Sequence, residues 1–398
     1  KRGIASFSSD KKGCYYHDIV RSEYVRVACI CPISFDMSVA ENTTTLLNGG
    51  TVVFADDEEQ YPINFGKFIS DNNIDVVWAT PSKFKMYLQS EVCHSSLKRL
   101  KRVVLAGEVL DYETARLSSS FPFELYNTYG PTETTIISTF YPVGNPQSNL
   151  PIGKPFANEY CYVLDNDGSL CEVGEKGELY ISGECVAVGY KNNATQTEEN
   201  FLQNPFGRGR LYKTGDLVCL GSDGNLHFYG RKDNQVKING FRVETEEVES
   251  AIYRITGDKT VVVCHEGRLV AFVESGNAQG NLTHRLKKIL PDYMIPSHIS
   301  YVEKFTLNNN DKTDKKALLK LLENIVPAEY VAPQNDMQKR IAECWERFLN
   351  GVKVGIDDDF YSLGGDSICA MRIASELNQI GVTLSMFYLL HNTTVRNL

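Results

Sequence analysis

A serine near the C-terminal end of the chain stands in a setting suited to covalent chemistry. Ser367 ends the glycine-rich run Asp359-Phe-Tyr-Ser-Leu-Gly-Gly-Asp-Ser367 and is followed by apolar residues at helical spacing. A serine at the start of a helix stays exposed, so its hydroxyl could carry a prosthetic group. A serine that only caps the helix has the same local sequence, and the residues upstream must decide between the two.

A second group of reactive side chains lies in the run Asn127-Thr-Tyr-Gly-Pro-Thr-Glu-Thr-Thr135. Its hydroxyl groups, placed beside a Gly-Pro turn, could donate hydrogen bonds to a phosphate. Glu133 could hold a hard cation through its carboxylate oxygens, and the ring of Tyr129 could stack on a base. A plain turn that exposes threonines would have the same local sequence.

Two later stretches contain polar groups suited to the sugar of a nucleotide. Asp216, in Tyr212-Lys-Thr-Gly-Asp-Leu217, is expected after a strand and a tight turn, where its carboxylate could accept hydrogen bonds from ribose hydroxyls. Arg231 could reach the nucleotide. Asp233 lies where the composition of the chain changes, which is typical of a joint between domains.

Composition excludes several classes of protein. The net charge is −9 and Lys and Arg form no long run, which argues against a nucleic-acid partner. No apolar stretch approaches the ~20 residues of a membrane span, and residues 1–15 are too polar for a secretory signal, so we expect a cytoplasmic protein without a membrane partner. The 11 cysteines show no paired spacing, which predicts free thiols in a reducing compartment.

The hydrophobic pattern predicts an α/β protein with several parts. Residues 1–232 alternate strand-like and helix-like runs, and short strands between residues 177 and 230 predict a β-rich subdomain. Residues 233–324 predict a small α+β subdomain, 325–333 a linker, and 334–398 an all-α domain. The clearest expected strands are 27–33, 50–55, 75–78 and 102–105, and the clearest expected helices are 65–72 and 81–91.

Seven motifs follow one another in the order typical of one family. They are Phe35–Ser38, Tyr129–Glu133, Gly177–Tyr190, Tyr212–Leu217, Gly230–Glu249, Leu290–Pro296 and Asn310–Lys315. From about residue 30 onward the chain therefore resembles the adenylation domain of a nonribosomal peptide synthetase, in the adenylate-forming superfamily, followed by a four-helix peptidyl carrier domain. The family's glycine-rich phosphate loop is absent, so we expect the N-terminal part of the adenylation domain to be missing.

The resemblance assigns roles to the polar residues described above. It implies adenine contacts for Asn127 and Tyr129, an α-phosphate contact for Thr132, magnesium binding for Glu133, and ribose contacts for Asp216 and Arg231. It also implies that Asp233 is a hinge, that Lys312 is the mobile catalytic lysine, and that Ser367 is the phosphopantetheine attachment site. From its local sequence alone, Lys312 is an ordinary surface lysine.

The resemblance also outlines a substrate pocket. Asp36 would bind an amino-acid ammonium, which needs a buried anionic partner; a solvated loop aspartate is the alternative. The expected lining is mostly apolar, which favours a branched aliphatic side chain such as valine, with an aromatic one second. By similarity to the family, the lining residues are Met37, Ala40, Trp78, Val104, Ala106, Thr128, Ile136 and Ile137.

The resemblance thus implies ATP-dependent formation of an aminoacyl-adenylate and transfer of the aminoacyl group to the carrier. The implied cofactors are ATP, Mg²⁺ and 4'-phosphopantetheine. The expected partners are the amino acid, neighbouring condensation or termination domains, and a phosphopantetheinyl transferase. Two alternatives stay open: a non-catalytic carrier and docking fragment, and an acyl- or aryl-CoA ligase, which Asp36 and the carrier domain both disfavour.

Overall fold

The computed structural model describes residues 24–398 except for 147–148, 234, 239, 266, 276–281, 307–312, 323–329, 350, 359, 361–362, 364, 366, 386–387 and 390–391. The chain divides into two compact units, Lys1–Asp233 and Asn234–Leu398. Each unit is described by itself below. The division falls directly after Asp233, the residue that the sequence marks as a joint.

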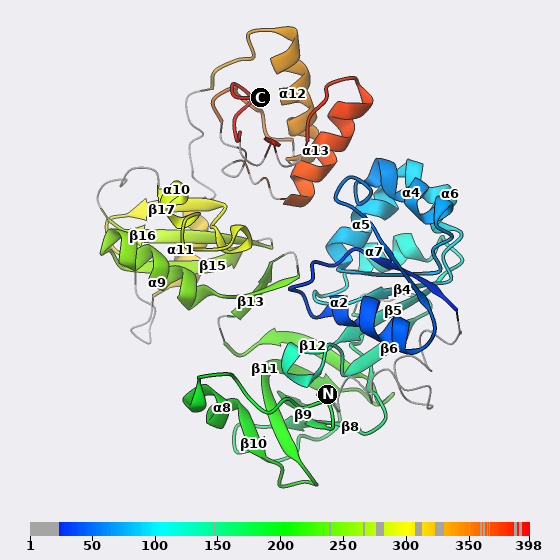
Figure 1. The fold of residues 1–398 in the computed structure, drawn as a ribbon. Coiled ribbons are helices and arrows are strands. Elements are labelled where there is room, and N and C mark those ends of the chain that lie inside the picture. The colour runs from blue at the N-terminus through cyan, green and yellow to red at the C-terminus, as the bar shows by residue number, and fades with distance from the viewer. Residues whose placement is uncertain are drawn as a thin grey trace. The chain divides into compact units, whose positions relative to one another are not determined.

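The first unit is built on a seven-stranded sheet with the strand order β2-β1-β3-β4-β5-β6-β7 (Figure 1). The first five strands in this order run parallel, and β6 and β7 are antiparallel to their neighbours. Short runs rich in β-branched residues are typical of such buried parallel strands. The strands are β1 (Arg26–Cys29), β2 (Thr51–Phe54), β3 (Val76–Ala79), β4 (Arg102–Leu105), β5 (Glu124–Tyr129), β6 (Thr139–Val143) and β7 (Lys154–Pro155).

Four helices connect and cover this sheet: α4 (Pro62–Asp71), α5 (Pro81–Gln89), α6 (Glu91–Leu97) and α7 (Tyr112–Ser118). Proline at the first helical position begins α4 and α5, where its missing N–H costs nothing. Asp111 caps α7 by accepting a hydrogen bond from the Thr114 N–H at 2.9 Å. The helices pack together through aromatic rings, as in the stack of Phe65 on Tyr87 at 3.9 Å between centroids.

The strand order creates a topological switch point at the carboxyl ends of the strands. The chain leaves β1 for β2 on one side and returns to β3 on the other, so the two connections diverge. In open parallel sheets, ligands bind at such a switch point, outside the carboxyl ends of the strands. The connection after β1 is a short helical segment formed by α2 (Met37–Val39), the π-helix η2 (Ala40–Thr44) and α3 (Thr45–Leu47).

A second, antiparallel sheet of the first unit has the order β10-β11-β9-β8, with β12 also paired to β11. It corresponds to the β-rich region expected from the sequence, although it begins earlier, at Glu159. One expectation was wrong here: Asp216 lies inside β11 and not after a strand, because β11 continues through an irregularity at positive-φ Gly215. The elements are β8 (Glu159–Leu164), β9 (Lys176–Gly183), α8 (Ala194–Asn200), β10 (Phe201–Gln203), β11 (Arg210–Leu220) and β12 (Leu226–Arg231).

The second unit contains a small α+β region with its own core. Helix α9 packs on the sheet β15-β16-β17 through buried Val248, Ala251 and Ile252, and it ends at Gly257 in the left-handed conformation (φ +79°). Its elements are β13 (Gln235–Ile238), β14 (Phe241–Glu244), α9 (Thr245–Thr256), β15 (Thr260–His265), β16 (Arg268–Glu274), α10 (Leu282–Leu286), β17 (His298–Val302) and α11 (Lys315–Leu322).

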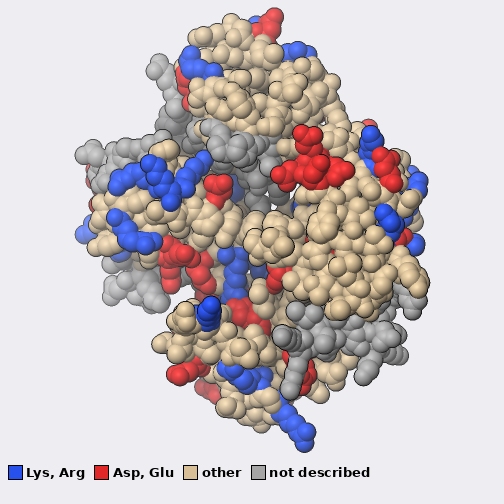
Figure 2. Space-filling model, viewed as in Figure 1, with Lys and Arg blue, Asp and Glu red and all other residues tan. Residues whose placement is uncertain are grey.

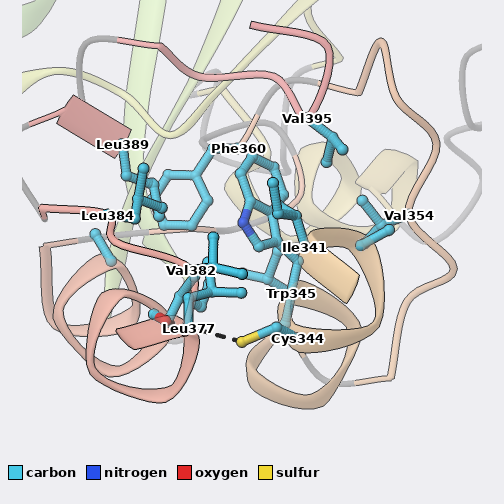
Figure 3. Packing of buried hydrophobic residues seen from close by; sticks show 14 of the residues in the cluster. Ile341, Cys344, Trp345, Val354, Phe360, Leu377, Val382, Leu384, Leu389 and Val395 are labelled. Atoms are coloured by element: carbon cyan, nitrogen blue, oxygen red, sulfur yellow. Dashed lines mark hydrogen bonds between the residues drawn. The ribbon is translucent and has the colours of Figure 1, made fainter. Parts of the chain in front are cut away.

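The C-terminal region of the second unit has a separate hydrophobic core. Helices α12 (Asp336–Phe348) and α13 (Ser367–Gln379) both contribute to it. Trp345 of α12 packs edge to face against Phe360, which lies between the two helices in the sequence (Figure 3). Helix α13 begins at Ser367, as the sequence predicts. The α/β class with an α-helical C-terminal domain is therefore confirmed.

The surface charges, the cysteines and the helix lengths show no unusual feature in the part of the chain that the structure describes. Acidic and basic side chains are interspersed on the face shown in Figure 2. All ten described cysteines are free thiols. None of the described helices has the length and apolar character needed to cross a bilayer.

The C-terminal core provides a direct test of this packing. Trp345 is fully buried, so Trp345→Ala should lower the free energy of unfolding of residues 330–398 by about 3–5 kcal/mol, through lost burial and a remaining cavity. Urea denaturation followed by circular dichroism measures this loss. Glu343→Ala, on the exposed face of α12, should change the value by less than about 0.5 kcal/mol. Equal effects of the two substitutions would contradict the assignment of the core.

Candidate functional site

The residues expected to line the substrate pocket come together at the carboxyl edge of the parallel sheet. Trp78 on β3, Val104 on β4 and Tyr126 on β5 are neighbours across the strands. Because side chains alternate along a strand, Ala106 and Thr128 extend the same face by one step. One buried cluster contains seven of the eight predicted lining residues: Met37, Ala40, Trp78, Val104, Ala106, Ile136 and Ile137.

Thr128 is the eighth residue and is also buried, with 2% of its surface exposed. Its hydroxyl donates a hydrogen bond to the Leu105 carbonyl oxygen at 2.9 Å. Because this bond satisfies the buried hydroxyl within the protein, Thr128 offers no free donor to a substrate side chain through this hydrogen atom.

Asp36 lies beside the nucleotide motif. It stands at the N-cap of α2, but its side chain does not cap that helix. Its Oδ2 atom instead accepts a hydrogen bond from the Thr132 hydroxyl at 2.5 Å. The predicted ligand of a substrate amine and the predicted ligand of a phosphate, 96 residues apart in sequence, are therefore in direct contact.

Backbone strain shapes the turn between β5 and β6. Thr135 and Ile136 both have positive φ, at 64° and 75°. This conformation is a genuine outlier for β-branched residues and costs about 1–3 kcal/mol at each position. The Ser138 N–H bonds to the Tyr129 carbonyl at 2.8 Å and closes the turn, and Ile136 then joins the pocket cluster.

Glu133 is held by the glycine-rich loop that follows β9. Its carboxylate accepts a hydrogen bond from the Tyr190 hydroxyl at 2.6 Å, and its carbonyl accepts one from the Ala187 N–H at 2.8 Å. The described residues contain no cluster of three or more His, Cys, Asp or Glu side chains that could hold a metal. Magnesium commonly binds one or two carboxylates together with substrate phosphates, and the single carboxylate of Glu133 fits that pattern.

Tyr190 is a residue that the sequence reasoning did not single out. Burial, followed by the hydrogen bond to Glu133, raises its pKa, so the phenol stays neutral and donates. Its position at the end of the Gly177–Tyr190 motif was the available signal, but nothing local connects it with Glu133, 57 residues away.

A hydrogen-bonded chain joins Tyr129 to the predicted ribose ligands. Asp216 and Arg231 face each other across β11 and β12, and Arg231 Nη1 lies 2.7 Å from Asp216 Oδ1. The Tyr129 hydroxyl donates to the other oxygen, Oδ2. Burial and the charge of Asp216 hold the pKa of Tyr129 well above its usual range, so it too stays neutral.

Arg231 also contacts the predicted hinge residue. Its Nε and Nη2 atoms lie 2.7 and 2.5 Å from the two carboxylate oxygens of Asp233. The guanidinium group is mostly buried, with 14% of the side chain exposed, whereas 48% of the Asp233 side chain is exposed. One guanidinium thus connects the buried Asp216 with the last residue of the first unit.

Asn127 shares a face of β5 with Tyr129, since the two are two residues apart on a strand. Its Nδ2 atom donates to the Pro151 carbonyl at 2.7 Å, which fixes the amide orientation. The predicted adenine contacts are therefore on the face of β5 opposite to the pocket residue Thr128.

Two predicted residues cannot be placed in this geometry. Lys312 lies outside the described residues. The backbone of Ser367 begins α13, but the described part of the chain does not include its side chain. Their roles stay predictions.

Comparisons with known proteins identify the families that the chain resembles. The family model for AMP-binding enzymes matches residues 4–191, and the model for a phosphopantetheine attachment site matches residues 339–398. Tyrocidine synthase 3 of Brevibacillus parabrevis is 36% identical over 361 residues, covering 87% of this chain. Malpibaldin synthetase of Mortierella alpina is 36% identical over 380 residues, covering 91%. The chain spans only 6% and 7% of these two relatives.

Solved structures also resemble the chain. A holo nonribosomal peptide synthetase protein with adenylation and PCP domains, bound to a vinylsulfonamide inhibitor, has a TM-score of 0.82 at 27% identity, covering 99% of this chain and 68% of that one. The adenylation domain AlmE of Vibrio cholerae, in complex with glycyl-adenosine-5'-phosphate, has a TM-score of 0.67 at 27% identity, covering 76% and 60%.

The buried carboxylate of Asp216 provides a test of the nucleotide site. Asp216→Asn keeps the shape of the side chain but removes its charge, while Arg231 keeps its pair with Asp233. Losing a charge-assisted hydrogen bond of about 1.5–3 kcal/mol should raise the Kd for a non-hydrolysable ATP analogue about 10- to 150-fold. Isothermal titration calorimetry measures this constant.

Glu178→Gln is the matched control for Asp216→Asn. Glu178 is equally buried and lies 3.2 Å from Lys232 in the same sheet, but it has no assigned contact with the nucleotide. Its Kd should stay within about twofold of the parent value. Equal weakening by both substitutions would mean that Asp216 acts only through the stability of the sheet.

Proposed function

Because the chain belongs to the AMP-binding enzymes, as an adenylation domain followed by a phosphopantetheine carrier domain, we propose that it activates an amino acid and loads it onto its own carrier. One observation carries the proposal: the hydrogen bond between Asp36 and Thr132. It joins an anion suited to an ammonium group with a hydroxyl suited to a phosphate. An amino acid held there has its carboxylate directed toward the α-phosphate of ATP.

The first reaction joins two anions and is therefore mainly a problem of positioning and charge. A carboxylate oxygen of the amino acid attacks the α-phosphorus, the bond to the β-phosphate breaks, and pyrophosphate leaves. Thr132 donates to the α-phosphate, and Asp216 and Arg231 hold the ribose. Glu133 would hold magnesium, which would supply positive charge beside the phosphates. We assign the remaining cationic role, bridging substrate carboxylate and phosphate, to Lys312 on the strength of the family resemblance.

The second reaction transfers the aminoacyl group to the carrier. Ser367 would carry phosphopantetheine, and the thiol of that group would take the aminoacyl group while AMP leaves from the activated carboxyl carbon. Ser367 holds this group at the beginning of α13, where a helix N-terminus favours a phosphate. In this proposal Asp233 is the hinge that lets one cleft serve both reactions in sequence.

The preferred substrate is a branched aliphatic amino acid, with valine as the first candidate. The pocket cluster is apolar, and Met37 and Trp78 occupy volume in it. Burying an unpaired polar or charged substrate side chain against such a wall is costly, which disfavours polar amino acids. An aromatic amino acid is the second candidate.

The partners follow from the same proposal. The chain spans a few per cent of relatives that are long synthetases, and it would work beside condensation or termination domains. A phosphopantetheinyl transferase would modify Ser367.

Removing the charge of Asp36 tests amino-acid activation. Asp36→Asn leaves the substrate ammonium opposite a neutral amide, a loss of about 1.5–3 kcal/mol, so kcat/KM for valine should fall about 10- to 150-fold with little change for ATP. Amino-acid-dependent ATP–pyrophosphate exchange with a panel of amino acids measures both activity and preference. Asp167→Asn, in an exposed turn, is the control and should retain the parent rate.

Three results of this assay would contradict the proposal. A charged amino acid as the best substrate would exclude the apolar pocket. Unchanged exchange in Asp36→Asn would remove Asp36 from the site. Exchange that requires no amino group, with coenzyme A as acceptor, would instead indicate an acyl-CoA ligase.

Loading of the carrier is tested separately. After incubation with a phosphopantetheinyl transferase and coenzyme A, the intact protein should gain the mass of one phosphopantetheine group, and a further aminoacyl mass after ATP and valine are added. Ser367→Ala should gain neither, because no hydroxyl remains to form the phosphodiester. Ser375→Ala, on the same helix, should load normally. Modification of Ser367→Ala would place the attachment site elsewhere.

A further inference from the structure

A buried carboxylate closes the loop that carries Asp36. Glu41, in the π-helix η2, has 0% of its surface exposed. Its Oε1 atom accepts a hydrogen bond from the Ile30 N–H at 3.3 Å, and its Oε2 atom accepts one from the Cys31 N–H at 3.1 Å. The side chain of residue 41 therefore returns to residues 30 and 31, at the carboxyl end of β1. Asp36 lies at the midpoint of the closed loop.

A lysine holds the same backbone from its other side. Lys83 Nζ donates to the Ile30 carbonyl oxygen at 3.1 Å and to Gln60 Oε1 at 2.7 Å. The Ile30 peptide thus has its N–H bound by Glu41 and its carbonyl bound by Lys83. Removing the Glu41 carboxylate and the Lys83 ammonium group from bulk water costs considerable free energy. Their presence here therefore indicates a role in this segment.

The helical segment after Asp36 allows this side chain to reach back. Met37 and Ala40 face the pocket cluster, and Glu41 directly follows Ala40. The change from α-helix to π-helix at Ala40 inserts an additional residue into the turn. Such π-bulges often occur at functional sites. Here the same short segment packs in the pocket and bonds to the end of β1.

The other end of β1 provides an internal comparison. The Asp75 Oδ2 atom accepts a hydrogen bond from the Arg26 N–H at 2.9 Å, and its other oxygen lies 2.7 Å from Lys101 Nζ. β1 therefore has a carboxylate bound to its backbone at each end. Only Glu41 belongs to the segment that presents Asp36.

We propose that Glu41 is a positioning residue for the substrate amine: by closing the loop from residue 31 to residue 41, it fixes Asp36 against Thr132. The proposal rests on the amino-acid activation proposed above. Glu41 does not touch the substrate. Its loss lets the loop move, so Asp36 meets the ammonium group in a wider range of positions and binding of the amino acid weakens, whereas the nucleotide contacts on β5 and β11 are unaffected.

The test compares Glu41→Gln with Asp75→Asn in the full protein. Glutamine has nearly the same volume as glutamate, but it presents an NH₂ group to one of the two backbone N–H donors. Amino-acid-dependent ATP–pyrophosphate exchange gives KM for valine and for ATP, and hydrogen–deuterium exchange without substrates reports the mobility of residues 30–41. Thermal unfolding shows how much stability each substitution removes.

We expect Glu41→Gln to raise KM for valine about tenfold, to leave KM for ATP within about twofold, and to speed amide exchange in residues 31–40 but not in β4. Asp75→Asn should lower Tm comparably without changing KM for valine. A purely structural role predicts equal kinetic effects of the two substitutions. An unchanged KM for valine in Glu41→Gln, or unchanged amide exchange in residues 31–40, overturns the proposal.

A second substitution keeps the test decisive if Glu41→Gln does not fold. Lys83→Met removes the hydrogen bond to the Ile30 carbonyl oxygen and keeps an apolar side chain of similar length. It should raise KM for valine about threefold, again with faster amide exchange in residues 31–40. Lys83→Met with parent kinetics and parent exchange overturns the proposal. If the parent protein shows no amino-acid-dependent exchange, the proposed function fails, and hydrogen–deuterium exchange still decides whether Glu41 closes the loop.

Discussion

The pairing of β1 between β2 and β3 is the constraint on which the site depends. Since both neighbours are parallel to β1, the chain must leave the carboxyl edge of the sheet in two opposite directions. The connections cannot cover the space between them, and the polar residues at the strand ends face it. The segment after β1 carries Asp36, and β5 ends with Tyr129 and leads into Thr132. A crevice with donors and anions at one edge is therefore a product of strand order, before any particular side chain is considered.

The short turn after β5 then organises two carboxylates at once. Tyr129 donates its hydroxyl hydrogen bond to Asp216, and Thr132 donates to Asp36. Each acidic group thus accepts a hydrogen bond from a neutral hydroxyl of the segment Tyr129–Thr132, and Asp216 is also paired with the charged Arg231. A neutral donor stabilises a carboxylate less than a charged one does, so in the proposed function an ammonium group can compete with the Thr132 hydroxyl for Asp36. Strain at Thr135 and Ile136 is the cost of bringing both hydroxyls and the pocket residue Ile136 into one turn.

The elements that the sequence predicted well are those with strong local signals. Strand 102–105 has the expected bounds, because a short β-branched run between turn residues allows few alternatives. The residues of the pocket cluster could also be predicted, since family motifs fix their positions in the sequence. The remaining features depend on contacts between distant residues. No local pattern connects Tyr190 with Glu133, places Asp216 inside a strand, or predicts positive φ at Ile136, where a β-branched side chain disfavours it. The local sequence places Glu41 on the surface of a helix, and only the structure shows its hydrogen bonds to the backbone at the end of β1.

Arg231 connects the nucleotide site with the boundary of the first unit. Its guanidinium group has five N–H donors. Three hydrogen bonds from this group connect it with Asp216 on one side and with Asp233 on the other. In the proposed function, a ribose bound at Asp216 would change the hydrogen bonds around Arg231, and the effect would reach Asp233 through a single planar group. Conversely, a backbone rotation at Asp233 that breaks its bidentate pair changes how Arg231 faces Asp216. If the ribose binds Asp216 as proposed, ligand binding and a rotation at Asp233 are thermodynamically linked through this side chain, and each biases the other by the same free energy.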